Sequence, residues 1–77
     1  MTDRAAPITS YRQGQDVCIE WLGVDDDQAA RLRELGLREG CRVCVMMNSD
    51  KCVLGFGSCR VALQREIAMC LFGSPAQ

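Results

Sequence analysis

The sequence predicts a mainly β fold, a small barrel of five short strands with one inserted α-helix and a short C-terminal helical turn. Three observations predict this fold. The chain has 77 residues, which leaves room for one compact domain. Several short segments alternate apolar and polar residues with the period of two that half-buried strands show. One segment carries clear start and stop signals of a helix. A barrel is expected because closing so small a sheet removes its exposed strand edges.

The domain is expected to span residues 8–72. Residues 1–7 are polar and end in a proline, so we expect them to form a mobile N-terminal tail. Residues 73–77 are expected to form a C-terminal tail. Hydrophobic residues make up 48% of the chain and charged residues 25%, which is ordinary globular usage and predicts that the chain folds.

The first strand is predicted at residues 16–22, where Val17, Ile19 and Trp21 alternate with the residues between them. If the alternation holds along the whole strand, these three side chains share its inward face. The lead-in before this strand, residues 8–14, is expected to be a short irregular segment that ends in a turn at a glycine.

The predicted helix follows the acidic run at residues 25–27 and ends before Gly36. Aspartates at a helix start accept hydrogen bonds from the unpaired first-turn amides and favour the positive end of the helix dipole. A glycine directly after the last turn suits a left-handed C-terminal cap. Ala29, Leu32 and Leu35 recur at helical spacing, so they are expected to dock the helix on the barrel.

Four more strands and the helical turn complete the predicted fold. The strands are expected at residues 41–48, 52–56, 58–63 and 69–72, and the helical turn at residues 64–68. In the first of these strands Cys41, Val43, Val45 and Met47 alternate with their neighbours, so they are expected to point inward together. Glycines at positions 55 and 57 predict a sharp bend between the next two strands.

Composition excludes several classes of function. Nine basic and ten acidic residues give a net charge of −1, without the positive excess that nucleic-acid binding uses, so no nucleic-acid partner is predicted. The chain has no histidine and therefore no histidine general base or Ser/His/Asp set, and we expect it not to be an enzyme. No apolar stretch approaches the length of a membrane span or a signal peptide, so we expect a cytoplasmic protein without direct membrane insertion.

Six cysteines in 77 residues are the most unusual feature of the composition. In the cytoplasm their thiols are expected to stay reduced. Zinc or iron could bind through cysteine alone, and the candidate ligands are Cys41, Cys44, Cys52 and Cys59. Cys41 and Cys44, however, lie an odd number of residues apart on a predicted strand and should point to opposite faces, so no metal cofactor is predicted.

The cysteines are otherwise expected to behave as small hydrophobic residues. By strand parity Cys41 and Cys52 keep apolar company, and we expect them to be packed inside. Cys18 and Cys44 fall opposite their apolar neighbours, so they are the candidates for exposed or reactive thiols.

Three segments together resemble one protein family. They are ITSYRQG at residues 8–14, RLRELGLREG at residues 31–40 and RVALQREIA at residues 60–68. In order and spacing they are similar to the FeoA family, small cytosolic proteins of bacterial ferrous iron uptake. The resemblance implies an SH3-like barrel with a helix inserted after the first strand. It also implies a non-enzymatic accessory or regulatory role, in which the protein binds FeoB, a membrane iron transporter with a cytosolic GTP-binding domain.

The resemblance also suggests which residues face the partner. The positions that match the family pattern are Leu32, Leu35, Gly36, Leu37, Gly40, Ala62 and Leu63. The candidates for partner binding are Arg31, Leu32, Arg33, Glu34 and Arg38, although the leucines at helical spacing are expected mainly to dock the helix. The chain departs from the family in its cysteine content and in having Asp50-Lys51 where relatives often have Asp-Pro.

Two other functions remain open at this stage. One is a small cysteine-based domain that binds a metal or senses redox state. The other is an iron-responsive regulatory domain, because the same barrel is similar to the C-terminal domain of iron-dependent transcriptional repressors.

Overall fold

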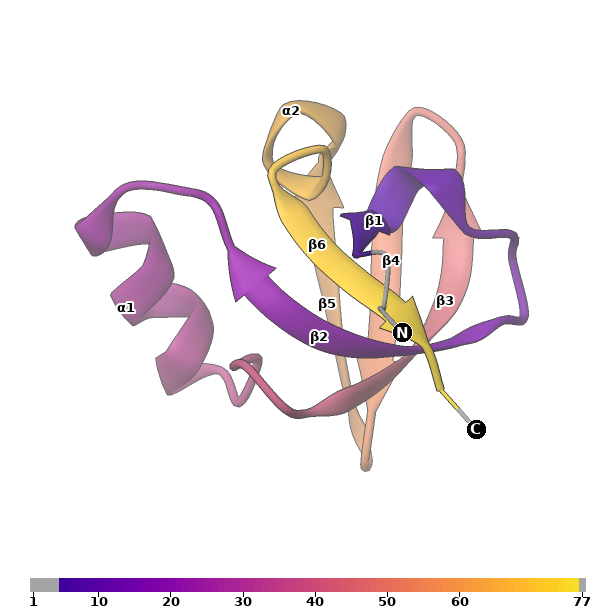
Figure 1. Cartoon of the computed structure of the whole chain (residues 1–77), viewed down its shortest axis with the longest axis horizontal. Helices are drawn as coiled ribbons and strands as arrows, with labels where there is room; N and C mark the ends of the chain where they lie inside the picture. Colours follow the sequence, from indigo (N-terminus) through magenta and orange to yellow (C-terminus); the bar gives the residue numbers. More distant parts are fainter. Residues whose placement is uncertain (1–4, 77) are drawn as a thin grey trace.

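The computed structural model describes residues 5–76 as one curled antiparallel sheet with two α-helices and a 3-10 turn, η1 (Figure 1). The strand order in the sheet is β1-β6-β2-β3-β4-β5, and every pairing is antiparallel. The elements are β1 (Ala6–Pro7), η1 (Ile8–Ser10), β2 (Asp16–Leu22), α1 (Asp26–Glu34), β3 (Arg42–Asn48), β4 (Lys51–Phe56), β5 (Cys59–Gln64), α2 (Arg65–Ala68) and β6 (Leu71–Pro75). The mainly β fold with one inserted helix and a C-terminal helical turn is confirmed.

One hydrophobic core fills the inside of the curled sheet. Its largest fully buried side chains include Ile8, Ile19, Leu37, Leu54 and Leu71, which come from η1, β2, the segment after α1, β4 and β6. The short helix α2 packs beside β5, β4 and η1, and it lies over one end of the sheet in Figure 1. The core therefore draws on nearly every element, as a domain of this size requires.

The helix α1 forms where the sequence predicts it. The Asp25 carboxylate accepts a hydrogen bond from the Gln28 amide at 2.8 Å and so caps the first turn. After the last turn Gly36 adopts a φ of +104°, and a Cβ there would lie 3.0 Å from the Phe56 ring. The left-handed backbone and the close ring both favour glycine at this position.

The predicted inward faces are wrong at three positions. Trp21, Met47 and Leu35 were expected inside, but 59%, 46% and 50% of their surfaces are exposed. The pairing register shifts between Ile19 and Trp21, and again between residues 45 and 47, because each strand contains a β-bulge. One extra residue in a bulge moves the following side chains to the other face of the sheet.

Leu35 is exposed for a different reason. It is the residue that caps α1, directly after the last helical residue, whereas Ala29 and Leu32 within the helix are buried. Leu37, in the following segment, is fully buried and donates its amide hydrogen bond to the Leu32 carbonyl at 2.9 Å. The chain turns inward after Gly36, so Leu37 takes the core position that the helical spacing assigned to Leu35.

The sheet extends into both predicted tails. Ala6 pairs with Gly73 and Pro7 with Phe72, so residues 6–7 belong to the sheet, and residues 1–4 lie outside the described part of the chain. The last strand runs Leu71–Pro75 instead of 69–72, because Met69 and Cys70 form the turn that leaves α2. The described sheet thus has six strands instead of five. The added segments, residues 6–7 and 73–75, are short and show no alternation of apolar and polar residues, so the pattern of hydrophobicity does not reveal them.

A polar cluster fastens the lead-in to the sheet. Asn48 Nδ2 donates to the carbonyl oxygens of Thr9 and Tyr11 at 3.0 and 2.7 Å. Arg65 Nη1 in turn donates to Asn48 Oδ1 at 3.0 Å and to the Ser49 carbonyl at 2.9 Å. These bonds join η1, the β3–β4 turn and α2, three segments far apart in the sequence.

Tyr11 makes the second connection from the lead-in. Its side chain is buried, and its hydroxyl donates to the Gly73 carbonyl at 2.7 Å. Burial raises the pKa of Tyr11 above its ordinary value. The hydroxyl therefore stays protonated and remains a donor at neutral pH.

Gly73→Ala is expected to lower the free energy of unfolding by about 2–3 kcal/mol, because the new methyl group overpacks the core. A Cβ at this position would lie 2.5 Å from Val17 Cγ1 and 2.7 Å from the Cys18 carbonyl oxygen. Urea unfolding followed by circular dichroism measures the change. Ser74→Ala, next along the same strand, is the control and should cost less than about 1 kcal/mol, because it removes one exposed hydrogen bond to Glu20. Equal effects of the two substitutions would contradict this account of Gly73.

Candidate partner-binding groove

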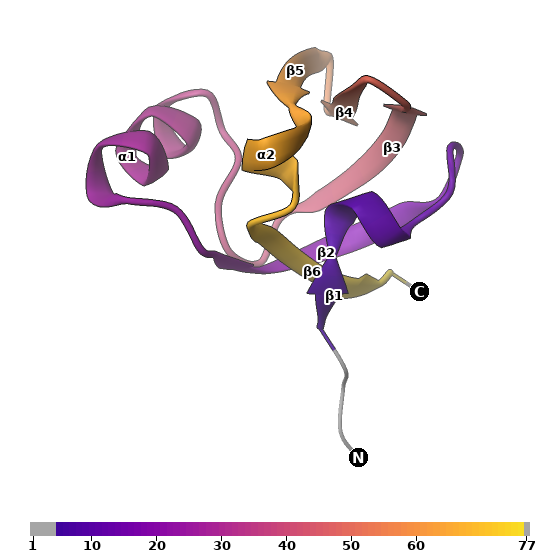
Figure 2. The same ribbon diagram turned by 90° about the horizontal axis from the view of Figure 1, so that it is seen from above.

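A groove lies between α1 on one side and β5 and α2 on the other. Its volume is about 190 Å³. In Figure 2 α1 lies to the left of β5 and α2. The residues that line it are Gln28, Arg31 and Leu32 of α1, Ala62, Leu63 and Gln64 of β5, and Ile67 of α2. All of these residues except Gln28 fall in two of the three sequence segments that carried the resemblance to a known family, residues 31–40 and 60–68.

The groove has an apolar floor and a polar rim. Leu32 and Leu63 are buried and Ile67 is half-buried, whereas Gln28 and Arg31 are exposed. Arg31 is the one charged residue among those lining the groove in the part of the chain that the structure describes. This arrangement suits an apolar side chain in the groove with a negatively charged group beside Arg31.

The structure separates the five residues proposed for partner binding. Arg31 and Leu32 line the groove, whereas Arg33, Glu34 and Arg38 are exposed and are not among its lining residues. Arg33 Nη2 instead pairs with Glu39 Oε2 at 3.0 Å. This hydrogen bond from Arg33 is the main reason why the pKa of Glu39 lies below its ordinary value.

Five of the residues that line the groove were not candidates for partner binding, and two of these, Ala62 and Leu63, were noted only as matches to the family pattern. The other three, Gln28, Gln64 and Ile67, were missed because each is an ordinary surface or helix residue when its segment is considered alone. Gln64 and Ile67 do fall within the segment at residues 60–68 that resembles the family pattern. That segment was the available signal, and it did not show that α1 would lie opposite.

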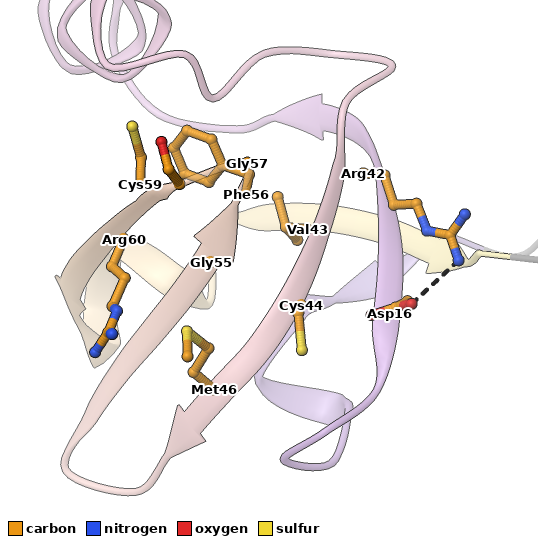
Figure 3. Close-up of a pocket in the computed structure, with 11 residues that line it drawn as sticks. Asp16, Arg42, Val43, Cys44, Met46, Gly55, Phe56, Gly57, Cys59 and Arg60 are labelled. Atoms are coloured by element: carbon orange, nitrogen blue, oxygen red, sulfur yellow. Dashed lines mark hydrogen bonds and ion pairs between the residues drawn. The ribbon is translucent and has the colours of Figure 1, made fainter.

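A second hollow of about 440 Å³ lies on the outer face of β3, β4 and β5 (Figure 3). Arg42 Nη2 and Asp16 Oδ2 form an ion pair across β3 and β2 at 3.1 Å. Met46 lies across Gly55, where a Cβ would come within 2.6 Å of its sulfur. The residues that line this hollow are Asp16, Arg42, Val43, Cys44, Met46, Gly55, Phe56, Gly57, Ser58, Cys59 and Arg60. The charges of Asp16 and Arg42 offset each other in this ion pair, so the net positive charge of the lining comes from Arg60.

The four cysteines considered as metal ligands occupy different environments. Cys41 packs against the hydrophobic core, whereas Cys44 lines the hollow on the outer face of the sheet. Cys52 is fully buried, and Cys59 is exposed at the same hollow as Cys44, so at most two of the four thiols share an environment. Among residues 5–76, no three histidine, cysteine, aspartate or glutamate side chains lie close enough together to hold a metal ion.

The prediction of which thiols are exposed is partly wrong. Cys18 and Cys44 are only half-buried, but the exposed thiol is Cys59, which was not a candidate. Cys59 directly follows the Gly57-Ser58 turn, so the start of β5 lies open to solvent. Burial raises the pKa of Cys52 above its ordinary value, and the nearby Arg65 opposes this shift only in part.

The curled antiparallel sheet, the inserted helix and the helical turn before the last strand define an SH3-like domain. The model of the FeoA domain family matches residues 6–75. The chain therefore belongs to the FeoA family, a family of small accessory domains tied to iron uptake and not a known enzyme family. A comparison with curated protein sequences finds no match.

Solved structures support the same fold. A crystal structure described as an iron uptake regulatory protein (FeoA) has a TM-score of 0.82 at 15% identity, and the match covers 95% of this chain and 99% of that one. The solution structure of a FeoA protein from Chlorobium tepidum has a TM-score of 0.85 at 15% identity, covering 92% of this chain and 70% of that one. A manganese-dependent transcriptional repressor has a TM-score of 0.84 at 18% identity, covering 99% of this chain and 44% of the repressor.

A helix that crosses a bilayer must be both long and apolar. Within residues 5–76, no helix is both long and apolar enough to cross a membrane.

With a maleimide reagent on the folded protein, Cys59 is expected to react first and Cys52 last. Cys59 is exposed, whereas Cys52 is fully buried and its thiol has a raised pKa. Timed labelling followed by proteolysis and mass spectrometry measures the order. Cys59→Ser, which should remove the fastest phase alone, is the control, and rapid labelling of Cys52 in the folded protein would contradict the assignment.

The same raised pKa has a consequence for stability. The folded state binds the Cys52 proton more tightly than the unfolded state does. The contribution of this protonated thiol to the free energy of unfolding is therefore complete below the unfolded pKa, about pH 8.5, and is lost as the pH rises through the folded pKa. In Cys52→Val this part of the alkaline loss of stability should disappear.

Proposed function

We propose that this protein is a non-enzymatic accessory protein of ferrous iron uptake that acts in the cytoplasm by binding FeoB. The groove between α1 and β5–α2 is the proposed contact site on this protein. The observation that carries the proposal is that two of the three segments that resemble the family, residues 31–40 and 60–68, contribute residues to the two walls of one groove.

The chemistry of the groove supports binding better than catalysis. Its lining offers leucine, isoleucine and alanine surface together with two glutamines and one arginine. Such a surface buries an apolar anchor and orients it with a few polar contacts, which is how protein-binding sites gain affinity. The proposed partner surface is the cytosolic part of FeoB.

The cysteine-based alternative has less support. Cys41, directly before β3, packs against the core and Cys44 in β3 lines the outer hollow, so both could bind one ion only if the backbone between them were distorted. We therefore do not assign metal binding or redox sensing to these thiols.

Arg31→Gln is expected to weaken binding to the cytosolic domain of FeoB by about tenfold, because it removes the charge at the rim of the groove. Arg33→Gln is the matched control, since Arg33 lies on the same helix but pairs with Glu39 outside the groove. Its affinity should stay within about twofold of the wild type. Isothermal titration calorimetry under reducing conditions measures both.

Two results would count against the proposal. If the wild-type protein does not bind the cytosolic domain or full-length FeoB, the proposed partner is wrong. If Arg33→Gln weakens binding as much as Arg31→Gln does, the partner contacts the exposed side of α1 instead of the groove.

A further inference from the structure

The strand β5 forms a free edge of the sheet. Within residues 5–76 it pairs only with β4, and it stands last in the strand order. A free edge presents a row of unpaired amide and carbonyl groups that another extended chain can pair with. At the other end of the order, β1 has only two residues, so β5 with six residues is the longer edge.

The register of the β4–β5 hairpin shows which of these groups are free. Phe56 pairs with Cys59 across the two-residue turn at Gly57-Ser58, and Gly57 has a φ of +60°. In such a hairpin the closing pair exchanges both backbone hydrogen bonds, and bonded and non-bonded pairs then alternate along the strands. Val61 and Leu63 therefore bond to β4 through their backbone groups.

The alternate residues point their backbone groups the other way. Arg60, Ala62 and Gln64 stand at the non-bonded positions opposite Gly55, Val53 and Lys51, so their amides face the free edge. The carbonyls of Arg60 and Ala62 face it too, whereas the carbonyl of Gln64, the N-cap of α2, accepts the first hydrogen bond of that helix. All three residues are exposed to solvent. They make a row of three donors and two acceptors at every second residue, which an added strand can pair with.

This free edge borders the groove. Ala62 and Gln64 belong to both, while Leu63 lies between them in the buried floor. Arg31 faces the same space from α1 and is its one charged lining residue in the described chain. Free backbone groups, an apolar floor and one cation thus meet at one place.

We propose that the groove binds an extended peptide segment of a partner protein as an added strand on β5. An apolar side chain of that segment would enter the groove, and an acidic side chain would pair with Arg31. The inference deepens the proposed function, on which it rests only for the identity of the partner. A second copy of this chain fits less well, because a symmetric pair at this edge would bring two Arg31 side chains and two α1 helices to the same space.

The test compares Ala62→Pro with Ala62→Ser. Proline removes the amide donor of residue 62, and it is tolerated in an edge strand where that amide does not bond to the sheet. Serine keeps the donor and adds little volume at an exposed position. Two probes are used, a phage-displayed library of random peptides of about 12 residues panned on the wild-type protein, and the purified cytosolic domain of FeoB.

Selected peptides should contain an acidic residue, bind Ala62→Pro about tenfold more weakly than the wild type, and bind Ala62→Ser within about twofold. Peptides that bind all three proteins equally, or a library that yields no binder, would overturn the inference. If the FeoB domain binds the wild type and Ala62→Pro equally, the proposed function stands and the added strand is wrong. If selected peptides behave as expected and the FeoB domain does not bind, the edge site stands and the proposed partner is wrong.

A second measurement applies if Ala62→Pro does not fold. Amide hydrogen exchange of the wild-type protein is compared with and without the selected peptide. Exchange at Ala62 and Gln64 should slow on binding, whereas Val61 and Leu63, already bonded to β4, should change little. Slowing at all four residues alike, or at none, would contradict strand addition, and a concentration-dependent dimer without peptide would assign the edge to a second copy.

Discussion

The close approach of β2 and β6 at Gly73 is the constraint on which the rest of the structure depends. Gly73 has no side chain, so Val17 and the backbone of Cys18 lie where a Cβ would stand. Its carbonyl accepts a hydrogen bond from the Tyr11 hydroxyl, and this bond holds the lead-in, residues 8–14, over the core. β6 can then pair with β1 on one side and with β2 on the other, and the sheet curls tightly enough to enclose a core in so short a chain.

Closing the sheet on the β6 side leaves it open on the β5 side. The inserted helix α1 lies opposite this open side, and the groove between them is lined by buried leucines with glutamines and an arginine at the rim. The polar cluster of Asn48 and Arg65 ties α2 to the β3–β4 turn, which positions the end of β5. Fold and candidate site are therefore consequences of the same arrangement, because the helix and the unpaired edge occupy the part of the barrel that backbone pairing does not close.

The sequence predicts local structure well and side-chain direction less well. The aspartate run and Gly36 locate α1 to within a residue or two, and the alternating segments locate β2 through β5. The two bulges carry no signal in the hydrophobic pattern, because the shift in register depends on the neighbouring strand, and so Trp21 and Met47 were placed inside. Arg31 and Leu32 were recognised as candidates, whereas the groove they line requires the three-dimensional meeting of α1 and β5, which no single segment encodes.

Amide hydrogen exchange of the free protein tests the central claim, that β5 is an unpaired edge, most directly. The account predicts an alternation along β5, with slow exchange at Val61 and Leu63 and fast exchange at Arg60 and Ala62. The two slow amides bond to β4, and the two fast ones face solvent. Uniformly slow exchange along the strand, at a concentration where the protein is monomeric, would contradict the account, because it would mean that another part of the chain already covers this edge.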